Sequence, residues 1–541
     1  MAKFIAGIAL GVSSFIACTA AFADTTPAAP DKCSALAKLT LPAKSIALPT
    51  RGARVDKAVL VAAETTGNTN GDYCAVTGVI LPVSTSAPGI EFQVNLASSW
   101  NGKAVQLGGG GYDGALVTGT GPAGLQPANV PTPLKQGYVT LGSDGGHKGG
   151  AGFDGTFGLD DEALLNYGHE STKKTHDVAL ELIRRYYGRA PAKFYFIGNS
   201  QGGHEALDAA ARYAADYDGV VSNFPAYNVT LLHLASLNVG KAVYANGGAG
   251  WLNAAKTKLL TDAVYAACDT VALDGAKDGI ISNVAGCNAA FNIAKVKATL
   301  ACPAGTDNDS CLTAAQIAAV EQIASPYRPG FAVAGLTEFP RWPLLEGALF
   351  QVSTFGTRPV PANPPTPADA LLYNAGAATS KYIISRNPAL DALTFDPNAT
   401  PELRARTQQV ASIMDVTDVD LTPFRKRGGK IILVHGTADD FISPYNTIAY
   451  YERHRALQGA QVFDSFVHFY LVPGLGHGIG PFNAKYDGLK ALEDWVEKGQ
   501  APGTLVAVDE NPKTKGRTLP MCRYPAWPKF SGQEYHCSTE H

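Results

Sequence analysis

Charged side chains are scarce in this chain, and neither sign dominates. Only 17% of the 541 residues are Asp, Glu, Lys or Arg, and the formal net charge is −3. Nucleic acids and anionic membrane surfaces are bound by concentrated positive charge, which this sequence does not provide. The composition therefore argues against both kinds of partner.

Repeats and long apolar runs are lacking as well. The sequence has no internal repeat and no coiled-coil heptads, and no apolar run beyond residue 23 is long enough to cross a bilayer. A chain of this length, with a globular composition rich in Gly, Ala and Pro, can bury a large core and form two or more domains. We expect a mature protein without a membrane span, and the sequence predicts no oligomeric state.

Residues 1–23 have the pattern of a secretory signal peptide. Lys3 gives the positive start, residues 4–17 the apolar stretch, and the Ala-Phe-Ala sequence at 21–23 a cleavage site. A membrane anchor is one alternative, although the run is short for a span. Lipidation at Cys18 is another, disfavoured by Phe15 at the first position of the lipoprotein box. The favoured prediction is a protein that is secreted or periplasmic.

The cysteines indicate disulfide bonds. Nine are present, and eight remain without Cys18. An even set in an exported protein is typical of disulfides, although eight cysteines allow about 105 pairings. Proximity in the sequence favours Cys33–Cys74, Cys268–Cys287, Cys302–Cys311 and Cys522–Cys537. No C-x-x-C motif occurs, so structural bridges are expected rather than redox catalysis.

A G-x-S-x-G pentapeptide, residues 198–202, separates a predicted strand from a predicted helix. Residues 193–198 are aromatic and β-prone, and apolar residues recur at helical spacing from residue 203. In a nucleophile elbow the serine occupies a strained turn, and flanking glycines avoid steric clashes. This context predicts Ser200 as a nucleophile, whereas the pentapeptide alone would also suit an ordinary turn.

Two later segments supply partners in the chain order Ser, Asp, His. Asp439 and Asp440 follow the β-forming run 431–434, and His477 lies in a Gly-rich loop after the predicted strand 469–472. In α/β-hydrolases an acid after a late strand orients the histidine that takes the serine proton. Most loop aspartates only cap turns or helices, and most loop histidines are solvated. Here the order and the preceding strands favour a triad.

Backbone amides for an oxyanion hole are predicted in two segments. Gln201 directly follows the nucleophile, and four glycines at 108–111 follow a strand-like segment. Glycine lets the backbone approach a substrate oxygen closely, so we expect donors at Gln201, Gly109 and Gly110. A flexible loop is the alternative. A phosphate-binding P-loop is excluded because no Lys-Ser/Thr follows the glycines.

Taken together, these segments resemble the tannase and feruloyl esterase family of α/β-hydrolases, which also includes hydrolases of terephthalate half-esters. The resemblance runs through nearly the whole mature chain. It is carried by LGGGGYDG, GSDGGHKG, YFIGNSQGGHEALDAAARYAADYDGVV, CDTVALDGAKDGI, FRKRGGKIILVHGTADDFISP, FYLVPGLGHG, LEDWVEKGQAP and the terminal CRYP. By motif position the family implies Ser200 as nucleophile, His477 as base and Asp439 as acid, with Asp440 one position too late.

The resemblance implies an α/β fold: an α/β-hydrolase sheet with flanking helices and a large inserted lid. Residues 24–227 and 421–541 are then expected to form the catalytic domain, and residues 228–420 the lid. The implied activity is serine-dependent hydrolysis of a small-molecule ester, with a galloyl, hydroxycinnamoyl or terephthaloyl acyl group. Two alternatives remain: a serine hydrolase acting on peptides or aliphatic polyester oligomers, and a non-catalytic binding protein on a hydrolase fold.

The chain departs from the family beside the triad. Members usually carry Cys directly before the nucleophile and Cys directly after the catalytic histidine, joined by a disulfide; Asn199 and Gly478 stand at these positions here. Both cysteines are absent together, which leaves no orphan thiol. We expect packing and hydrogen bonds, some of them from Asn199, to hold Ser200 against His477.

The resemblance further implies a structural Ca²⁺ ion in the lid. Family members bind calcium in an Asp-rich loop closed by a disulfide that corresponds to Cys268–Cys287. The matching ligands are the carboxylates of Asp274 and Asp278 and the carbonyls of Ala276 and Ile280. Asp269 is a further match, but two additional residues lie between it and Asp274. Hard oxygen ligands on a turning loop suit Ca²⁺, although the spacing is not that of an EF-hand. A polar Gly-rich turn without metal is the alternative.

Overall fold

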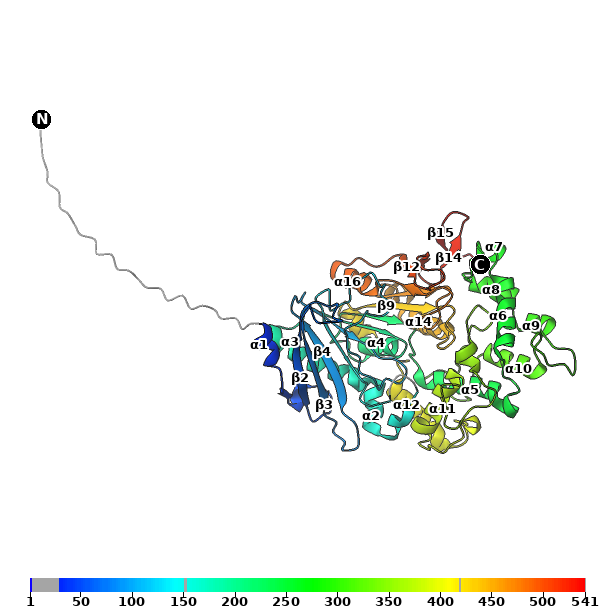
Figure 1. Cartoon of the computed structure of the whole chain (residues 1–541), viewed down its shortest axis with the longest axis horizontal. Coiled ribbons are helices and arrows are strands. Elements are labelled where there is room, and N and C mark those ends of the chain that lie inside the picture. Colours follow the sequence, from blue (N-terminus) through cyan, green and yellow to red (C-terminus); the bar gives the residue numbers. More distant parts are fainter. Residues whose placement is uncertain (2–28, 150–152, 418–419, 541) are drawn as a thin grey trace.

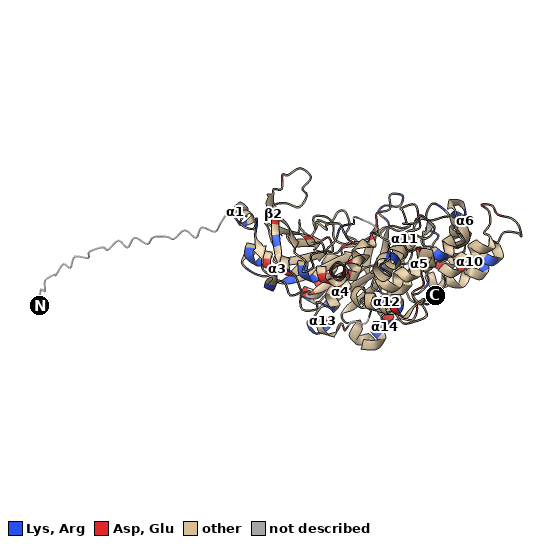
Figure 2. Cartoon of the chain, turned by 90° about the horizontal axis from the view of Figure 1, so that it is seen from below, with Lys and Arg blue, Asp and Glu red and all other residues tan. Residues whose placement is uncertain are grey.

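The computed structural model describes residue 1 and residues 29–149, 153–417 and 420–540. Apart from residue 1, the predicted signal peptide and Cys18 lie outside the described residues. None of the helices in the described ranges has the length and apolarity needed to cross a membrane. In the cartoon of Figure 2, the positions of Lys and Arg and those of Asp and Glu are scattered along the described chain.

A ten-stranded mixed sheet forms the centre of the molecule (Figure 1). In spatial order the strands are β1 (Thr40–Leu41), β2 (Ala53–Val61), β3 (Tyr73–Ile80), β4 (Ile90–Ala97), β6 (Val139–Ser143), β5 (Lys103–Leu107), β7 (Lys193–Asn199), β8 (Gly219–Asn223), β9 (Lys430–Gly436) and β10 (Val467–Val472). Strands β1 to β4 pair antiparallel, as do β4 and β6, whereas β6, β5, β7, β8, β9 and β10 pair parallel. The loops that follow the parallel strands therefore meet at one edge of the sheet.

The parallel strands are mostly apolar and buried because helices cover both faces of the sheet. Alternate residues of β9 belong to two different cores: Ile431 and Leu433 to one, Ile432 and Val434 to the other. Helices α3 (Ser171–Tyr187), α4 (Gln201–Ala211) and α14 (Pro444–Gln458) contribute to the first core. Helix α16 (Gly488–Lys498) covers the opposite face and buries Leu489, Leu492 and Trp495, which share one side of the helix.

A helical lid occupies the chain between β8 and β9 and lies at the green to yellow end of the molecule in Figure 1. Its helices are α5 (Val229–Gly248), α6 (Ala254–Cys268), α7 (Val271–Asp274), α8 (Val284–Ala290), α9 (Ile293–Thr299), α10 (Ala314–Ile323), α11 (Leu371–Ala378) and α12 (Pro401–Met414). The lid core also includes Tyr112, Tyr167 and Phe441 from outside the lid, so the lid packs tightly on the catalytic part. The predicted limits fall directly before α5, at Asn228, and directly before α13, at Leu421.

The remaining elements are short. They are α1 (Ala29–Ser34), α2 (Asp161–Leu165), α13 (Thr422–Lys426), α15 (Ala460–Phe463), the small sheet of β11 (Ala484–Lys485), β12 (Leu505–Asp509) and β13 (Thr518–Met521), the hairpin of β14 (Trp527–Phe530) and β15 (Tyr535–Ser538), and the 3₁₀ or π segments η1 (Ala43–Ser45), η2 (Gly155–Leu159), η3 (Asn166–Glu170), η4 (Gln351–Phe355), η5 (Thr379–Ile384) and η6 (Ala392–Thr394).

The four predicted disulfides are confirmed. Cys33–Cys74 joins α1 to β3, and Cys268–Cys287 closes the loop between α6 and α8. Cys302–Cys311 closes a second lid loop, and Cys522–Cys537 fastens the C-terminal hairpin. Each bridge restricts the unfolded chain and is expected to stabilise the fold by about 2–4 kcal/mol.

Candidate active site

Ser200 lies on the sharp turn between β7 and α4. Its backbone has φ 59° and ψ −117°, a region that is strained for a residue with a side chain. Two hydrogen bonds fix the turn: the Ser200 N–H donates to the carbonyl of Asn223 at 3.0 Å, and the His204 N–H donates to the carbonyl of Ser200 at 3.0 Å. The turn thus holds the serine at the carboxyl-terminal edge of the sheet.

The glycines around Ser200 are required by close backbone contacts. A Cβ atom on Gly198 would lie 2.1 Å from the carbonyl oxygen of Gly202. A Cβ atom on Gly202 would lie 2.9 Å from the backbone of Gly108, in the glycine loop after β5. The pentapeptide therefore both forms the turn and lets the glycine loop pack against the start of α4.

Ser200, His477 and Asp439 form a continuous hydrogen-bonded chain. The Ser200 Oγ lies 2.9 Å from His477 Nε2, and His477 Nδ1 lies 2.9 Å from Asp439 Oδ2. Asp439 follows β9 and His477 follows β10, so the parallel order of the sheet brings them to the same edge as Ser200. Asp440 makes no such bond; its carboxylate accepts a hydrogen bond from Ser353 of the lid.

The electrostatics of the site suit a histidine that accepts a proton. Burial disfavours the charge on Asp439, but the neighbouring His477 and His435 outweigh burial and hold the pKa of this carboxyl below its usual range. Burial likewise lowers the pKa of His477, and the charge and hydrogen bond of Asp439 more than reverse this, so that the pKa is raised. The arrangement stabilises an imidazolium next to a serine hydroxyl.

Three residues around the triad were not singled out from the sequence. The His477 ring packs between Phe224 and Phe441, with ring centroids 4.9 and 5.2 Å away. His435 is fully buried, its Nε2 lies 2.9 Å from the carbonyl oxygen of Ile442, and the same atom lies 3.3 Å from the Asp439 carboxylate. The sequence held one indication that His435 would lie near the acid: it is on the predicted strand that leads to Asp439, four residues before it.

The predicted oxyanion donors differ in availability. Gln201 is the first residue of α4, so its N–H has no acceptor within the helix. The Gly109 N–H, by contrast, donates to Glu205 Oε2 at 2.9 Å. Gly110 is exposed and faces open space. Of the two predicted glycines, Gly109 is therefore engaged by Glu205, and Gly110 is left as the candidate donor.

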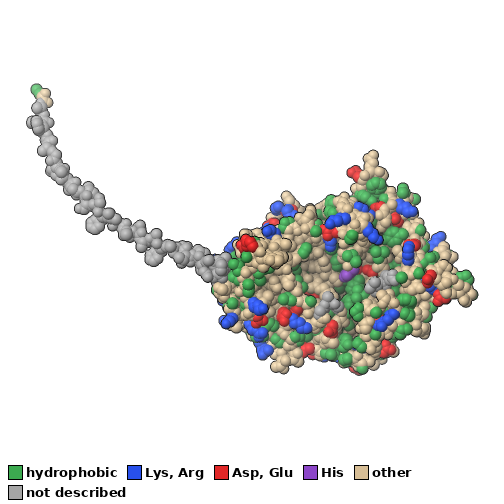
Figure 3. Space-filling view, in the orientation of Figure 1, with side chains coloured by type: hydrophobic (Ala, Val, Ile, Leu, Met, Phe, Trp, Pro, Cys, Tyr) green, Lys and Arg blue, Asp and Glu red, His purple; other side chains and the backbone are tan. Residues whose placement is uncertain are grey.

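A pocket of about 780 Å³ opens beside His477, between the catalytic loops and the lid. Its walls include Phe350 and Leu371 from the lid and Phe441 and Ile479 from the catalytic loops. Figure 3 shows hydrophobic side chains around a hollow in the middle of this face. A largely apolar pocket of this size, with a few polar groups, suits a small organic ligand.

Asn199, directly before Ser200, takes part in a hydrogen-bonded chain. Its side chain donates to the carbonyl of Gly124 at 3.3 Å and accepts from Asn223 at 2.8 Å. The oxygen of the Asn223 side chain accepts from the hydroxyl of Tyr486 at 2.8 Å. Tyr486 follows the loop that carries His477, so the chain links that part of the molecule to the end of β7.

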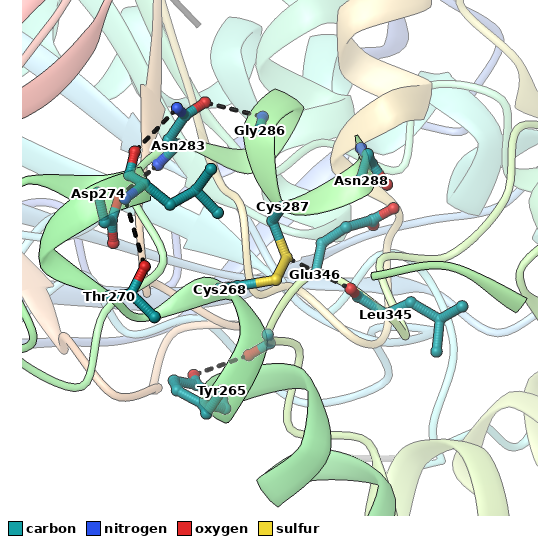
Figure 4. The surroundings of a disulfide bond; sticks show 12 residues. Tyr265, Cys268, Thr270, Asp274, Asn283, Gly286, Cys287, Asn288, Leu345 and Glu346 are labelled. Carbon is teal, nitrogen blue, oxygen red and sulfur yellow. Dashed lines mark hydrogen bonds between the residues drawn. A yellow bond between two sulfur atoms is a disulfide. The ribbon is translucent and has the colours of Figure 1, made fainter. Parts of the chain in front are cut away.

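The lid loop between Cys268 and Cys287 is rich in oxygen ligands (Figure 4). Asp274 is buried next to Asn283, and its carboxylate accepts the N–H groups of Ser282 and Asn283. Asp269 accepts the N–H groups of Asp278 and Gly279. Burial, with the charges of Asp278 and Asp269, raises the pKa of Asp274 to about 7. Carboxylates that repel one another in an oxygen-rich loop suit the chemistry of Ca²⁺.

The carboxylate atoms of this loop are not gathered around one point. In the described ranges, the one trio of His, Asp, Glu or Cys whose ligand atoms lie within 4.8 Å of one another is His176, Asp177 and Asp216. Lys173 lies between those two aspartates, 2.7 and 2.9 Å from their oxygens, and supplies the positive charge there. That trio is therefore an ion-pair cluster.

A mixed sheet with a parallel half, a serine on a strained strand-to-helix turn and a histidine within 2.9 Å of its Oγ define an α/β-hydrolase. Comparison with known proteins narrows this class. Residues 74–540 match the family described as tannase and feruloyl esterase, and the chain belongs to that family. It is accordingly a carboxylic ester hydrolase of the tannase and feruloyl esterase type.

Relatives along most of the chain carry esterase names. An uncharacterized esterase of Agrobacterium fabrum is 38% identical over 509 residues, 92% of this chain and 90% of that protein. A mono(2-hydroxyethyl) terephthalate hydrolase of Piscinibacter sakaiensis is 31% identical, over 85% of this chain and 83% of its own. A probable feruloyl esterase B-2 of Aspergillus terreus is 27% identical, over 86% of this chain and 85% of its own.

Solved structures share the fold. Feruloyl esterase B from Aspergillus oryzae superposes with a TM-score of 0.74 at 21% identity, covering 94% of this chain and 100% of that one. Tannin acyl hydrolase from Aspergillus niger gives a TM-score of 0.72 at 20% identity, covering 94% of this chain and 95% of that one. These similarities establish the α/β-hydrolase fold.

Proposed function

We propose that this protein is an exported serine esterase that hydrolyses esters of aromatic carboxylic acids. The hydrogen-bonded chain from Ser200 Oγ through His477 to Asp439, with both distances at 2.9 Å, is the observation that carries the proposal. Export is supported by the N-terminal sequence pattern and by four disulfides, which form in oxidising compartments.

The reaction begins when the Ser200 Oγ attacks the ester carbonyl carbon and its proton passes to His477 Nε2. The carbonyl oxygen becomes an oxyanion, and the N–H groups of Gln201 and Gly110 are the donors proposed to hold it. Asp439 stabilises the imidazolium and keeps Nδ1 protonated. Collapse of the intermediate breaks the bond to the alcohol oxygen, which leaves with the proton from His477 Nε2.

Water completes the cycle. His477 Nε2 takes a proton from the water that attacks the acyl-enzyme carbonyl, and it returns that proton to Ser200 Oγ as the carboxylic acid leaves. The serine, histidine and aspartate then have their starting protonation states.

The proposed acyl group is aromatic. Phe350 and Phe441 border the pocket beside His477, and flat apolar walls favour an aryl ring. The names of the relatives, which include a terephthalate ester hydrolase and feruloyl esterases, favour the same class. Galloyl, hydroxycinnamoyl and terephthaloyl esters are therefore the candidate substrates.

A structural calcium ion in the lid is part of the proposal. Asp274 and Asp278, with the carbonyls of Ala276 and Ile280, would hold it, and Asp269 is the further candidate ligand. The ion would neutralise the mutual repulsion of these carboxylates and stiffen the lid loop. The loop lies apart from the triad in sequence, and no step of the ester hydrolysis uses it.

The substrate class is tested with a panel of methyl gallate, methyl ferulate, a terephthalate half-ester, an aryl acetate and an aliphatic hydroxyacid ester. The proposal predicts that kcat/KM is highest for one of the three aromatic acyl esters. A preference for the aliphatic ester, or cleavage of a peptide and of none of the esters, would overturn the aromatic assignment.

A further inference from the structure

Two buried carboxyl groups, Asp113 and Glu205, face each other behind the glycine loop and outside the triad. Asp113 is 5% exposed and Glu205 is 8% exposed. Glu205 lies on α4, five residues after Ser200, and Asp113 lies just after the glycine loop of residues 108–111. Both side chains lie against Gly109: its N–H donates to Glu205 Oε2 at 2.9 Å, and Asp113 Oδ1 lies 2.0 Å from where a Cβ atom of this residue would be.

In the described part of the chain no side-chain donor serves Asp113, and the backbone N–H of Gly110 approaches its carboxylate without reaching full hydrogen-bond geometry. Its Oδ1 and Oδ2 are both buried, and in the described part of the chain neither has a hydrogen-bond partner. A buried carboxylate without a partner is costly, and two facing carboxylates repel each other. A single proton held between the two groups removes one charge and supplies the missing donor, because a carboxylic acid donates and a carboxylate accepts.

The glycine loop is fastened to this pair. The Gly109 N–H donates to Glu205 Oε2 at 2.9 Å, and the Gly109 carbonyl accepts the N–H of Gly202 at 3.1 Å. A Cβ atom on Gly109 would lie 2.0 Å from Asp113 Oδ1, and one on Gly108 would lie 2.6 Å from Glu205 Oε2. The backbone of the loop thus lies directly on both carboxyl groups, one residue before Gly110.

We infer that Asp113 and Glu205 share one proton and that the protonated pair positions the glycine loop so that Gly110 can bind the oxyanion. The inference rests on the proposed serine esterase function. Asp113 and Glu205 are positioning residues, since they act on the substrate only through the loop.

The surrounding groups leave the shared proton in place. The titratable neighbours on the packed elements are Asp144, Tyr167, His204, Asp208 and Tyr217, and burial keeps Tyr217 neutral by raising its pKa well above the usual range. Asp144 binds Lys148 at 3.0 Å, and the nitrogens of His204 lie 3.0 Å from the Ala226 carbonyl and 3.1 Å from Asp208, so both groups are engaged elsewhere. Burial keeps Tyr167 neutral by raising its pKa well above the usual range.

The pair should lose its proton near or above neutral pH. Burial raises the pKa of Glu205 to about 7, and burial, with the charge of Glu205, raises the pKa of Asp113 well above its usual range. Because these pKa values are raised in the folded protein, the protonated pair exists below them. The stabilisation is lost as the pH rises through them, when two charged carboxylates repel under the loop.

The experiment compares pH profiles of wild type, Glu205→Gln, Asp113→Asn and Glu205→Ala, with Glu181→Gln on α3 as a matched control. The carboxamides in Glu205→Gln and Asp113→Asn accept and donate hydrogen bonds as the shared pair does, but they do not titrate. We expect kcat near the wild-type value at neutral pH and no fall of kcat on the alkaline side. Glu205→Ala should lower kcat by about 10-fold or more with little change in KM, because the oxyanion is bound only during reaction.

A second readout does not depend on activity. The Tm of wild type and of inactive Ser200→Ala should fall as the pH rises from 6 to 9, and this fall should be smaller in Glu205→Gln and Asp113→Asn. If the Ser200→Ala variant kept esterase activity, the proposed function would be wrong, while the Tm profiles would still test the shared proton. Profiles of kcat and Tm in Glu205→Gln and Asp113→Asn that match wild type would overturn the inference.

Discussion

His477 Nε2 lies 2.9 Å from Ser200 Oγ although 277 positions separate the two residues in the sequence. The contact exists because β7 and β10 run parallel in one sheet, so that the loops after both strands reach the same edge. No covalent link joins Asn199, which directly precedes Ser200, to Gly478, which directly follows His477. The catalytic geometry depends on the sheet and on the side chains packed around it.

Replacement of Asp439 by Asn should lower kcat by about 10³–10⁴-fold, because the amide favours the wrong tautomer of His477 and removes the charge that stabilises the imidazolium. Asp440→Asn is the matched control, since Asp440 binds Ser353 and not His477. Steady-state kinetics on an aryl ester measures both. An Asp440→Asn variant that is the more damaged of the two would contradict the assignment of the acid.

The acid limb of the pH profile should report His477. Burial lowers the pKa of His477, but Asp439 raises it by more, so the pKa lies above the ordinary imidazole value of about 6.5. As the pH decreases, kcat/KM should therefore begin to fall above that value. Below that pKa the imidazole is protonated and cannot accept the serine proton. Measurement in Asp439→Asn should show the limb at lower pH. An acid limb unmoved by Asp439→Asn would show that another group titrates.

The Asn199–Asn223–Tyr486 chain should support the catalytic loops. Tyr486→Phe removes the donor to the buried Asn223 side chain and should cost about 0.5–1.5 kcal/mol of unfolding free energy together with a fall in kcat. Tyr187→Phe loses a hydrogen bond to the Ala97 carbonyl far from the serine turn and serves as control. We expect the control to lose stability at unchanged kcat. Equal kcat values in both variants would argue against a role for the chain in positioning.

Removal of calcium should destabilise the lid without altering the chemistry. A chelator is expected to lower the Tm and to leave kcat unchanged at temperatures where the protein stays folded, because the proposed ligands belong to the lid loop. Asp274→Asn should have the same reduced Tm with or without chelator. A Tm that does not respond to chelator or to added Ca²⁺ would show that the loop is a metal-free turn.

Much of the architecture follows from local sequence patterns. The strand before Ser200, the helix after it and the order of Asp439 and His477 were predictable because each strand is a short apolar run followed by glycine, and each functional residue follows such a run. The disulfides were predictable from sequence proximity, since each bridge joins one cysteine of the set to the next one along the chain.

Contacts between distant segments were not predictable in the same way. Phe224 and Phe441 enclose the His477 ring only because β8 and β9 are neighbours in the sheet, and sequence spacing does not reveal that relation. The bond from the Gly109 N–H to Glu205 was equally hidden, because it depends on how closely the glycine loop packs against α4. It leaves Gly110 as the predicted glycine that remains a candidate donor.

The most direct test of the account is the rate of hydrolysis of one aromatic ester, methyl ferulate or methyl gallate, by wild type and by Ser200→Ala. The account predicts a loss of kcat of at least about 10³-fold in the variant, with unchanged Tm and unchanged circular dichroism. Hydrolysis by folded Ser200→Ala at a rate close to wild type would show that Ser200 is not the nucleophile and would contradict the proposed mechanism.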